Sequence, residues 1–84
     1  MGPVIEVDLR LLRAAVVVAE ELNISRAAKR LGISQPGLTK QIQELEERVE
    51  ERLFHRDTQK VELTDAGRAF VAEAMVLSIL RCIA

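Results

Sequence analysis

A short stretch from Gly32 to Ile42, GISQPGLTKQI, carries the side chains with the clearest chemistry in this 84-residue chain. Gln35 and Thr39 are four residues apart, so a helix would place them on one face, with Lys40 beside them. A primary amide and a hydroxyl both donate and accept hydrogen bonds, whereas an ammonium group only donates. These three groups together suit an anionic partner that also presents hydrogen-bonding edges.

Charge is unevenly distributed along the chain. The net charge is −1, which taken alone disfavours a nucleic-acid partner. Residues 25–43 nevertheless contain four basic residues and no acidic one, whereas residues 44–52 contain five glutamates and two arginines. One positive segment on a neutral or acidic body is typical of an anion-binding surface. The alternative is an ordinary solvated helix surface.

Hydrophobic spacing predicts a chain made mainly of helices. The β-branched run at residues 16–18 leaves a buried strand as an alternative within the first helix. Small polar residues precede each helix and are expected to cap it, and Pro36 suits the first turn of the third helix. The predicted helices cover residues 8–22, 26–31, 35–49 and 65–83, and the expected caps are Asp8, Ser25, Ser34 and Thr64.

Two short strands are predicted at residues 53–56 and 61–63, joined by a turn at 57–60. A hairpin this small is marginal alone and must pack on the helices. The order is helix, helix, tight turn, helix, hairpin and helix. This order predicts a mainly α, winged helix-turn-helix fold with a three-helix core and a two-stranded wing. A last helix of about 30 Å follows it.

The motifs resemble the N-terminal domain of the LysR-type transcriptional regulators. They are DLR at 8–10, VAEELN at 18–23, SRAAxxLGISQP at 25–36, LTKQIxxLE at 38–46, LFxR at 53–56 and LTxAG at 63–67. They occur in order and without a gap over about residues 8 to 75. The resemblance implies a DNA-binding domain over residues 1–64 and a linker and dimerisation helix over 65–84.

The chain departs from the family pattern at several positions. Ala15 stands where the family usually has phenylalanine, and Lys40 where arginine is more common, which gives up bidentate geometry. Glu50 replaces the glycine that usually ends the third helix, so that helix is expected either to run on or to end with strain. Glu51 replaces an apolar residue. Family members are much longer and carry an effector-binding domain, so we expect a truncated or excised DNA-binding domain.

The resemblance and the residue chemistry together nominate a surface for double-stranded DNA. Glutamine can pair bidentately with adenine in the major groove, proline can pack on a thymine methyl, and helix N-termini attract phosphates. The third helix is expected in the major groove, and the resemblance places the wing near the minor groove. We expect base readout by Gln35, Pro36, Thr39 and Lys40, phosphate contacts by Ser25, Arg26, Ser34, Lys40 and Gln43, and wing contacts by Arg56, Gln59 and Lys60.

These roles have structural alternatives. Ser25 and Ser34 would act as caps with or without DNA. The alternative for Lys60 is an ordinary exposed lysine in the turn. Arg56 could pair with an acidic residue at the end of the third helix. The glutamates at positions 46, 47, 50 and 51 are expected to form a solvated helix face.

The last helix carries more apolar residues than one face on a small core needs. The resemblance implies that it pairs with its copy in a homodimer, which would bind a dyad-symmetric site. Packing on its own domain is the alternative. The residues expected at the dimer helix are Val71, Met75, Leu77, Ile79, Leu80 and Ile83.

Other classes of function have little support in the sequence. It contains no metal-spaced ligand cluster, glycine-rich phosphate loop or nucleophile motif, so neither enzyme activity nor a cofactor is expected. The lone Cys82 fits a reducing cytoplasm, and no apolar run is long enough to span a bilayer. A small-molecule effector is expected only through a domain absent from this chain. The rivals kept open are a winged helix used for protein contact and a regulator of another winged-helix family.

Overall fold

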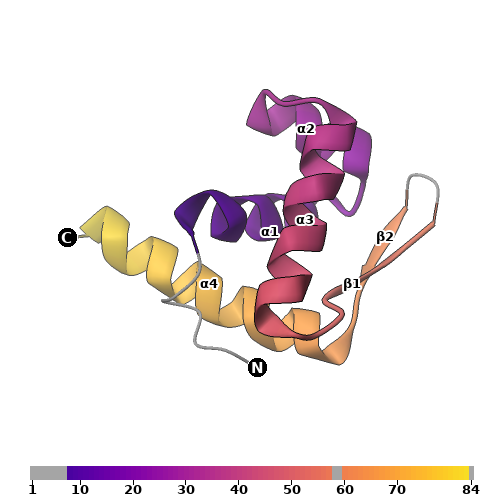
Figure 1. Ribbon diagram of the computed structural model, residues 1–84. Helices are drawn as coiled ribbons and strands as arrows, with labels where there is room; N and C mark the ends of the chain where they lie inside the picture. The colour runs from indigo at the N-terminus through magenta and orange to yellow at the C-terminus, as the bar shows by residue number, and fades with distance from the viewer. Residues whose placement is uncertain (1–7, 58–59, 84) are drawn as a thin grey trace.

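Four helices and a two-stranded hairpin make up the part of the chain that the structure describes, residues 8–57 and 60–83 (Figure 1). The structure is a computed structural model, with side chains described over residues 8–57 and 60–76. The elements confirm the predicted winged helix-turn-helix and the helical conformation of residues 16–18. They are α1 (Leu9–Glu21), α2 (Ile24–Leu31), α3 (Gln35–Val49), β1 (Phe54–Arg56), β2 (Val61–Leu63) and α4 (Asp65–Ile83).

Three of the four predicted helix caps are confirmed. In each, a side-chain oxygen accepts a hydrogen bond from an N–H of the first turn, which otherwise has no partner within the helix. The bonds run from Arg10 N to Asp8 Oδ1 at 2.8 Å, from Gly37 N to Ser34 Oγ at 3.1 Å and from Gly67 N to Thr64 Oγ1 at 2.9 Å.

The cap predicted for α2 is wrong. The helix begins at Ile24, and Asn23 is its N-cap, because Asn23 Oδ1 accepts a hydrogen bond from Arg26 N at 2.9 Å. Ser25 is therefore the second residue of the helix. Asparagine is as good a cap as serine, and the preceding helix α1 ends at Glu21, which leaves room for an earlier start.

The ends of α1, α2 and α3 all turn through the left-handed region. Gly32 has φ 71°, Leu22 has φ 50° and Glu50 has φ 57°. Helix α3 therefore does not run on past Val49. Its end closes with hydrogen bonds from Glu50 N to Glu47 O at 3.3 Å and from Glu51 N to Glu46 O at 3.2 Å. Two of these three caps use residues with a side chain where glycine would be unstrained.

The core is aliphatic and lies around α1, which packs against α2, α3 and α4 (Figure 1). Both aromatic residues, Phe54 and Phe70, are fully buried. Ala15 is also fully buried, so its small side chain lies inside the core. Ala27 and Ala28 on α2 are buried as well, which lets the helices of the helix-turn-helix approach closely.

The hairpin is antiparallel and attached to the helices at both ends. Phe54 pairs with Leu63 and Arg56 with Val61, so β1 starts one residue later than predicted. Near the wing, an isolated bridge joins Asn23 to Lys60, and Val61 N donates to Leu22 O at 3.3 Å. The wing is thus fixed to the α1–α2 connection as well as to the start of α4.

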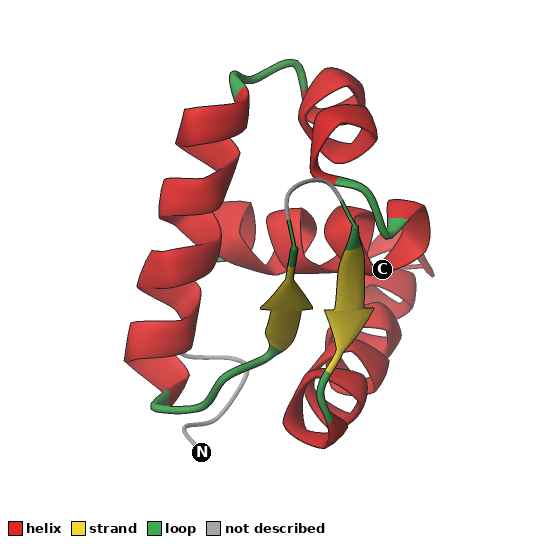
Figure 2. Ribbon diagram, turned by 90° about the vertical axis from the view of Figure 1, so that its right-hand side faces the viewer, coloured by secondary structure: helices red, strands yellow, loops and turns green. Residues whose placement is uncertain are grey.

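The start of α4 lies directly against the start of the hairpin, as Figure 2 shows. Leu53 O accepts a hydrogen bond from Thr64 N at 3.0 Å. A Cβ atom at Gly67 would lie 1.9 Å from the same carbonyl oxygen. Only glycine allows this approach, so Gly67 lets α4 begin directly against the start of the hairpin.

Candidate nucleic-acid interface

The first turn of α3 is compact, capped and exposed. Ser34 caps it, Pro36 occupies the first turn, and Gly37 lies so close to the cap that an added Cβ would be 3.0 Å from Ser34 Oγ. Gln35, Pro36 and Lys40 are exposed, and Thr39 is half-buried. Pro36 has no N–H, and Gly37 N and Leu38 N donate to Ser34, which among the described residues leaves the N–H of Gln35 free. The turn therefore presents this one N–H group and partial positive charge with little side-chain bulk in front of them.

A shallow surface hollow unites the predicted helix and wing residues. It lies between the start of α2, the first half of α3 and the end of β1. Sequence reasoning missed Ile24 and Asp57, since nothing in their local spacing shows that they meet α3. The lining residues are Ile24, Gln35, Pro36, Thr39, Lys40, Gln43, Arg56 and Asp57.

The three polar residues of α3 that line this hollow are available to a ligand. Among the described residues, the side chains of Gln35, Thr39 and Lys40 have no hydrogen-bond or ion-pair partner. An unpaired amide, hydroxyl and ammonium on one helical face can meet donors, acceptors and negative charge of a partner. The hollow is therefore chemically suited to a polyanion with base-like edges.

One cation of the positive segment is neutralised by α1. Arg30 Nη1 lies 2.8 Å from Glu20 Oε1 and 3.2 Å from Glu21 Oε2. The hydrogen bond with Glu20, with its charge and the contact to Glu21, raises the pKa of Arg30. Arg26, Lys29 and Lys40 are exposed, and their side chains have no described partner. The positive surface thus depends on three of the four predicted residues.

The predicted phosphate residues lie at the starts of α2 and α3 and further along α3. Ser34 Oγ accepts from Gly37 N, so its hydroxyl proton is still available for donation. Arg26 is exposed in the first turn of α2, and Ser25 precedes it. Gln43 is exposed two turns into α3 and lines the hollow. Only Gln43 and Lys40 of the predicted phosphate set line the hollow itself.

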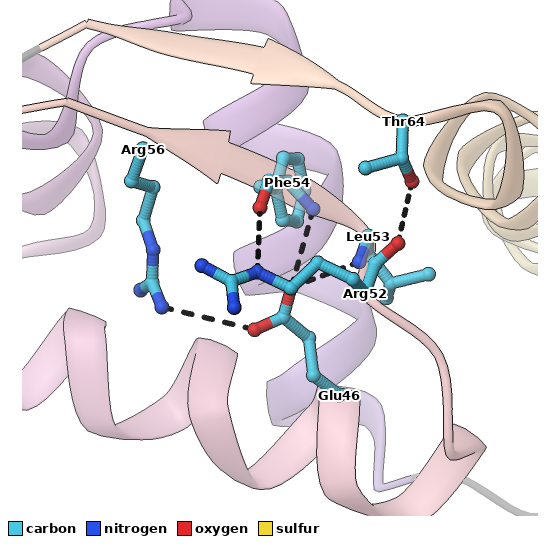
Figure 3. A network of polar contacts seen from close by, with 6 residues as sticks. All are labelled: Glu46, Arg52, Leu53, Phe54, Arg56 and Thr64. Atoms are coloured by element: carbon cyan, nitrogen blue, oxygen red, sulfur yellow. Dashed lines mark hydrogen bonds and ion pairs between the residues drawn. The ribbon is translucent and has the colours of Figure 1, made fainter.

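The wing residues have different environments. Arg56 Nη2 lies 3.7 Å from Glu46 Oε1, so the predicted alternative of an ion pair with α3 is realised (Figure 3). Lys60 is exposed immediately before β2. Gln59 lies outside the described residues. Arg56 lines the hollow from the wing side.

The expectation that Glu46 belongs to a solvated face is wrong. Its side chain is 12% exposed, and Oε2 accepts hydrogen bonds from Leu53 N at 2.8 Å and Phe54 N at 3.2 Å. The Glu46 carboxylate therefore connects α3 to Leu53 and Phe54 at the start of β1 by hydrogen bonds (Figure 3). Helical spacing gives no sign of this role, because the amides come from a segment seven residues later.

The apolar face expected at α4 divides between core and surface. Val71 is 6% exposed and belongs to the domain's own core, whereas Met75 is 37% and Val76 56% exposed. Val71 is therefore not available to a partner, and Val76 is an exposed apolar residue that the sequence did not single out. The side chains of Leu77, Ile79, Leu80 and Ile83 lie outside those described.

The described part of the chain offers neither a metal site nor a membrane-spanning helix. It contains no group of three or more histidine, cysteine, aspartate or glutamate side chains able to hold a metal ion. His55 is exposed on β1 opposite Glu62. No described helix combines the length and the apolar character that crossing a membrane requires.

Comparisons with known proteins agree with this geometry. Residues 9–68 match the family model described as "Bacterial regulatory helix-turn-helix protein, lysR family". The chain is 57% identical over 67 residues to the HTH-type transcriptional regulator BudR of Klebsiella aerogenes. That match covers 80% of this chain and 47% of BudR, so the chain spans about half the length of that relative.

Solved structures of similar domains include complexes with DNA. The crystal structure of the CbnR_DBD–DNA complex is similar with a TM-score of 0.85 and 40% identity, over 89% of this chain and 86% of that one. The crystal structure of the BenM_DBD/catB site 1 DNA complex has a TM-score of 0.83 and 38% identity. The match covers 92% of this chain and 88% of the BenM domain.

Proposed function

This chain belongs to the lysR family of bacterial regulatory helix-turn-helix proteins and is a DNA-binding domain of that family, and from this premise we propose how it binds. Helix α3 enters the major groove of double-stranded DNA, and the wing approaches the adjacent minor groove. The observation that carries the proposal is the hollow that unites Gln35, Thr39 and Lys40 of α3 with Arg56 of the wing. A duplex seated there meets helix and wing together.

The proposed base contacts come from the exposed first half of α3. The Gln35 amide pairs bidentately with an adenine, and Pro36 packs on a thymine methyl group. Thr39 and Lys40 lie on the following turn and reach the next base edge. Each good bidentate pair contributes about 1–3 kcal/mol of discrimination against the wrong base. Gln35 is therefore the proposed main source of sequence preference.

The proposed phosphate contacts surround this base-reading face. The N-termini of α2 and α3 carry partial positive charge that attracts phosphate oxygens, beside the hydroxyls of both serines. Lys40 supplies charge as well as base contact. The proposed phosphate set is Ser25, Arg26, Ser34, Lys40 and Gln43 on the helices. The proposed wing contacts near the minor groove come from Arg56, Gln59 and Lys60.

We propose that residues 65–84 act as a linker and dimerisation helix beyond the DNA-binding domain of residues 1–64. The exposure of Met75 and Val76 supports an apolar contact along α4. A second copy held there would set two α3 helices against a dyad-symmetric site. Any small-molecule effector would act through a domain outside this chain.

Fluorescence anisotropy with labelled duplexes tests the proposal on the 84-residue chain. If about four to six phosphates are neutralised per protomer, the logarithm of affinity falls with the logarithm of salt at about −0.9 per contact. Gln35→Ala should reduce the preference for a selected site while leaving binding to random DNA nearly unchanged. Equal losses on selected and random duplexes would contradict the base-reading role.

A winged helix that serves protein contact would behave differently. Its binding to duplexes would be absent at low salt, or equally weak in the wild type and in Lys40→Ala. The proposed interface predicts instead that Lys40→Ala weakens binding to all duplexes and lowers the salt slope by about 0.9.

A further inference from the structure

The guanidinium of Arg56 does not use all of its hydrogen-bond donors in the domain without DNA. Its side chain is 17% exposed, and Nη2 lies 3.7 Å from Glu46 Oε1, near the outer limit of an ion pair. Nη1 is buried and has no hydrogen-bond partner in the described structure. A buried donor without an acceptor disfavours the conformation that holds it. Arg56 is therefore bound only weakly by its protein neighbours, although most of its side chain is buried.

Glu46, in contrast, keeps its partners when Arg56 is removed. Its Oε2 accepts hydrogen bonds from the amides of Leu53 and Phe54, and a carboxylate with two such donors is well satisfied. Figure 3 shows this carboxylate between the two amides and the guanidinium. Departure of Arg56 would thus leave the connection between α3 and β1 in place.

The location of Arg56 gives it a second choice of partner. It lines the hollow that contains Gln35 and Lys40, and it also lines a separate hollow with Glu47 and Glu50 at the end of α3. The guanidinium lies at the boundary between the proposed DNA surface and an acidic surface. Guanidinium groups bind phosphate oxygens with bidentate geometry. A phosphate of a duplex in the first hollow would therefore bind Arg56 more strongly than Glu46 does at 3.7 Å.

We propose that Arg56 exchanges Glu46 for a phosphate of the DNA backbone when the duplex binds. Glu46 is a positioning residue: it keeps Arg56 beside the interface in the free domain and fixes the wing to α3 in both states. The proposal rests on the proposed DNA-binding function and adds a cation that changes partner. A partly exposed ion pair changes an equilibrium constant by a factor of about two to five. Because the duplex must break the Arg56–Glu46 pair in order to bind Arg56, the pair lowers the affinity for DNA by that factor.

The first test compares the salt dependence of duplex binding for the wild type, Arg56→Gln and Arg56→Lys. The exchange predicts a slope smaller by about 0.9 in Arg56→Gln and an unchanged slope in Arg56→Lys. Lys40→Gln provides a positive control for the loss of one cation. An unchanged slope in Arg56→Gln would overturn the exchange, because a cation that stays on Glu46 releases no counterion from DNA.

The second test removes the competitor. Glu46→Gln retains an oxygen for the two amides but loses the charge that holds Arg56. Its affinity for a random duplex should rise about two- to fivefold above that of Glu47→Gln, which changes the same charge on an exposed neighbour without touching Arg56. This difference should vanish when Arg56→Gln is added to both variants. Equal affinities of Glu46→Gln and Glu47→Gln would contradict the proposal.

The two proposals fail in different ways. Failure of the wild-type chain to bind any duplex would refute the proposed function itself. Wild-type binding with an unaltered slope in Arg56→Gln would refute only the exchange. Urea unfolding of each variant establishes that it is folded, and if Glu46→Gln is not, the slopes of the two Arg56 variants decide alone.

Discussion

Replacing Glu50 with glycine should stabilise this domain. Glu50 has φ 57° at the end of α3, where a residue with a Cβ atom is disfavoured by about 1–2 kcal/mol. Glycine removes that cost but adds about 0.5–1 kcal/mol of backbone entropy loss on folding. The Glu50 side chain is exposed, so little packing is lost. We therefore expect a net gain of about 0.5–1 kcal/mol in the free energy of unfolding.

Thermal unfolding followed by circular dichroism measures this gain. For a domain of this size, 1 kcal/mol shifts Tm by about 4–8 °C, so Glu50→Gly should raise Tm by about 2–8 °C. Glu50→Ala removes the same charge but keeps the Cβ atom. Glu51→Gly introduces the same flexibility at a residue that is not in the left-handed region. A Tm for Glu50→Gly no higher than that of Glu50→Ala would refute the reasoning from backbone strain.

Three further predictions concern other contacts. Gly67→Ala should destabilise the domain by about 2–3 kcal/mol or more in urea unfolding, because the new methyl group would overlap Leu53 O; an unchanged transition midpoint would show that α4 moves without cost. Asn23→Ala should cost about 1 kcal/mol and Asn23→Gly only a few tenths, as expected for the N-cap of α2, and equal losses would place the cap elsewhere. Arg30→Gln should leave the salt slope of DNA binding nearly unchanged, since Arg30 is paired with Glu20 and Glu21, and a slope reduced as much as in Lys40→Gln would place Arg30 at the DNA.

Much of the fold follows from local patterns. The bounds predicted for α3, β2 and α4 agree with the structure, because apolar spacing, a serine or threonine cap and Pro36 act within a few residues of one another. The same applies to the hairpin, whose turn residues are adjacent in sequence. Local signals suffice where the competing local conformations are few.

The errors occur where the outcome depends on neighbours in space. Asn23 caps α2 in place of Ser25, because the short connection after α1 places Asn23 in extended conformation, with Leu22 in the left-handed region before it. The role of Glu46 depends on where the hairpin returns to α3. Helical periodicity predicts neither the Asn23 cap nor the hydrogen bonds of Glu46. The short connection between α1 and α2 is a usable signal for the Asn23 cap.

Sequence patterns indicate which face of α3 is exposed, but not every ion pair around it. The exposed face of α3 is indicated by Gln35 and Pro36, neither of which a first helical turn requires, and by Lys40, which belongs to the positive segment. The ion pairs of Arg30 with α1 remove one cation from the positive segment, and no sequence pattern predicts them. The ion pair of Arg56 with α3 is one of the two alternatives that the sequence left open. Ile24 and Asp57 joined the hollow only through tertiary packing.

Selection of bound duplexes from a random pool, with wild type and Gln35→Ala compared side by side, decides whether the start of α3 reads DNA bases. We expect the wild type to enrich a site with two related half-sites in dyad symmetry, and Gln35→Ala to lose preference at one or two positions in each half. A pool that shows no enriched sequence with the wild type, or the same enriched sequence with both proteins, would contradict base readout by the start of α3.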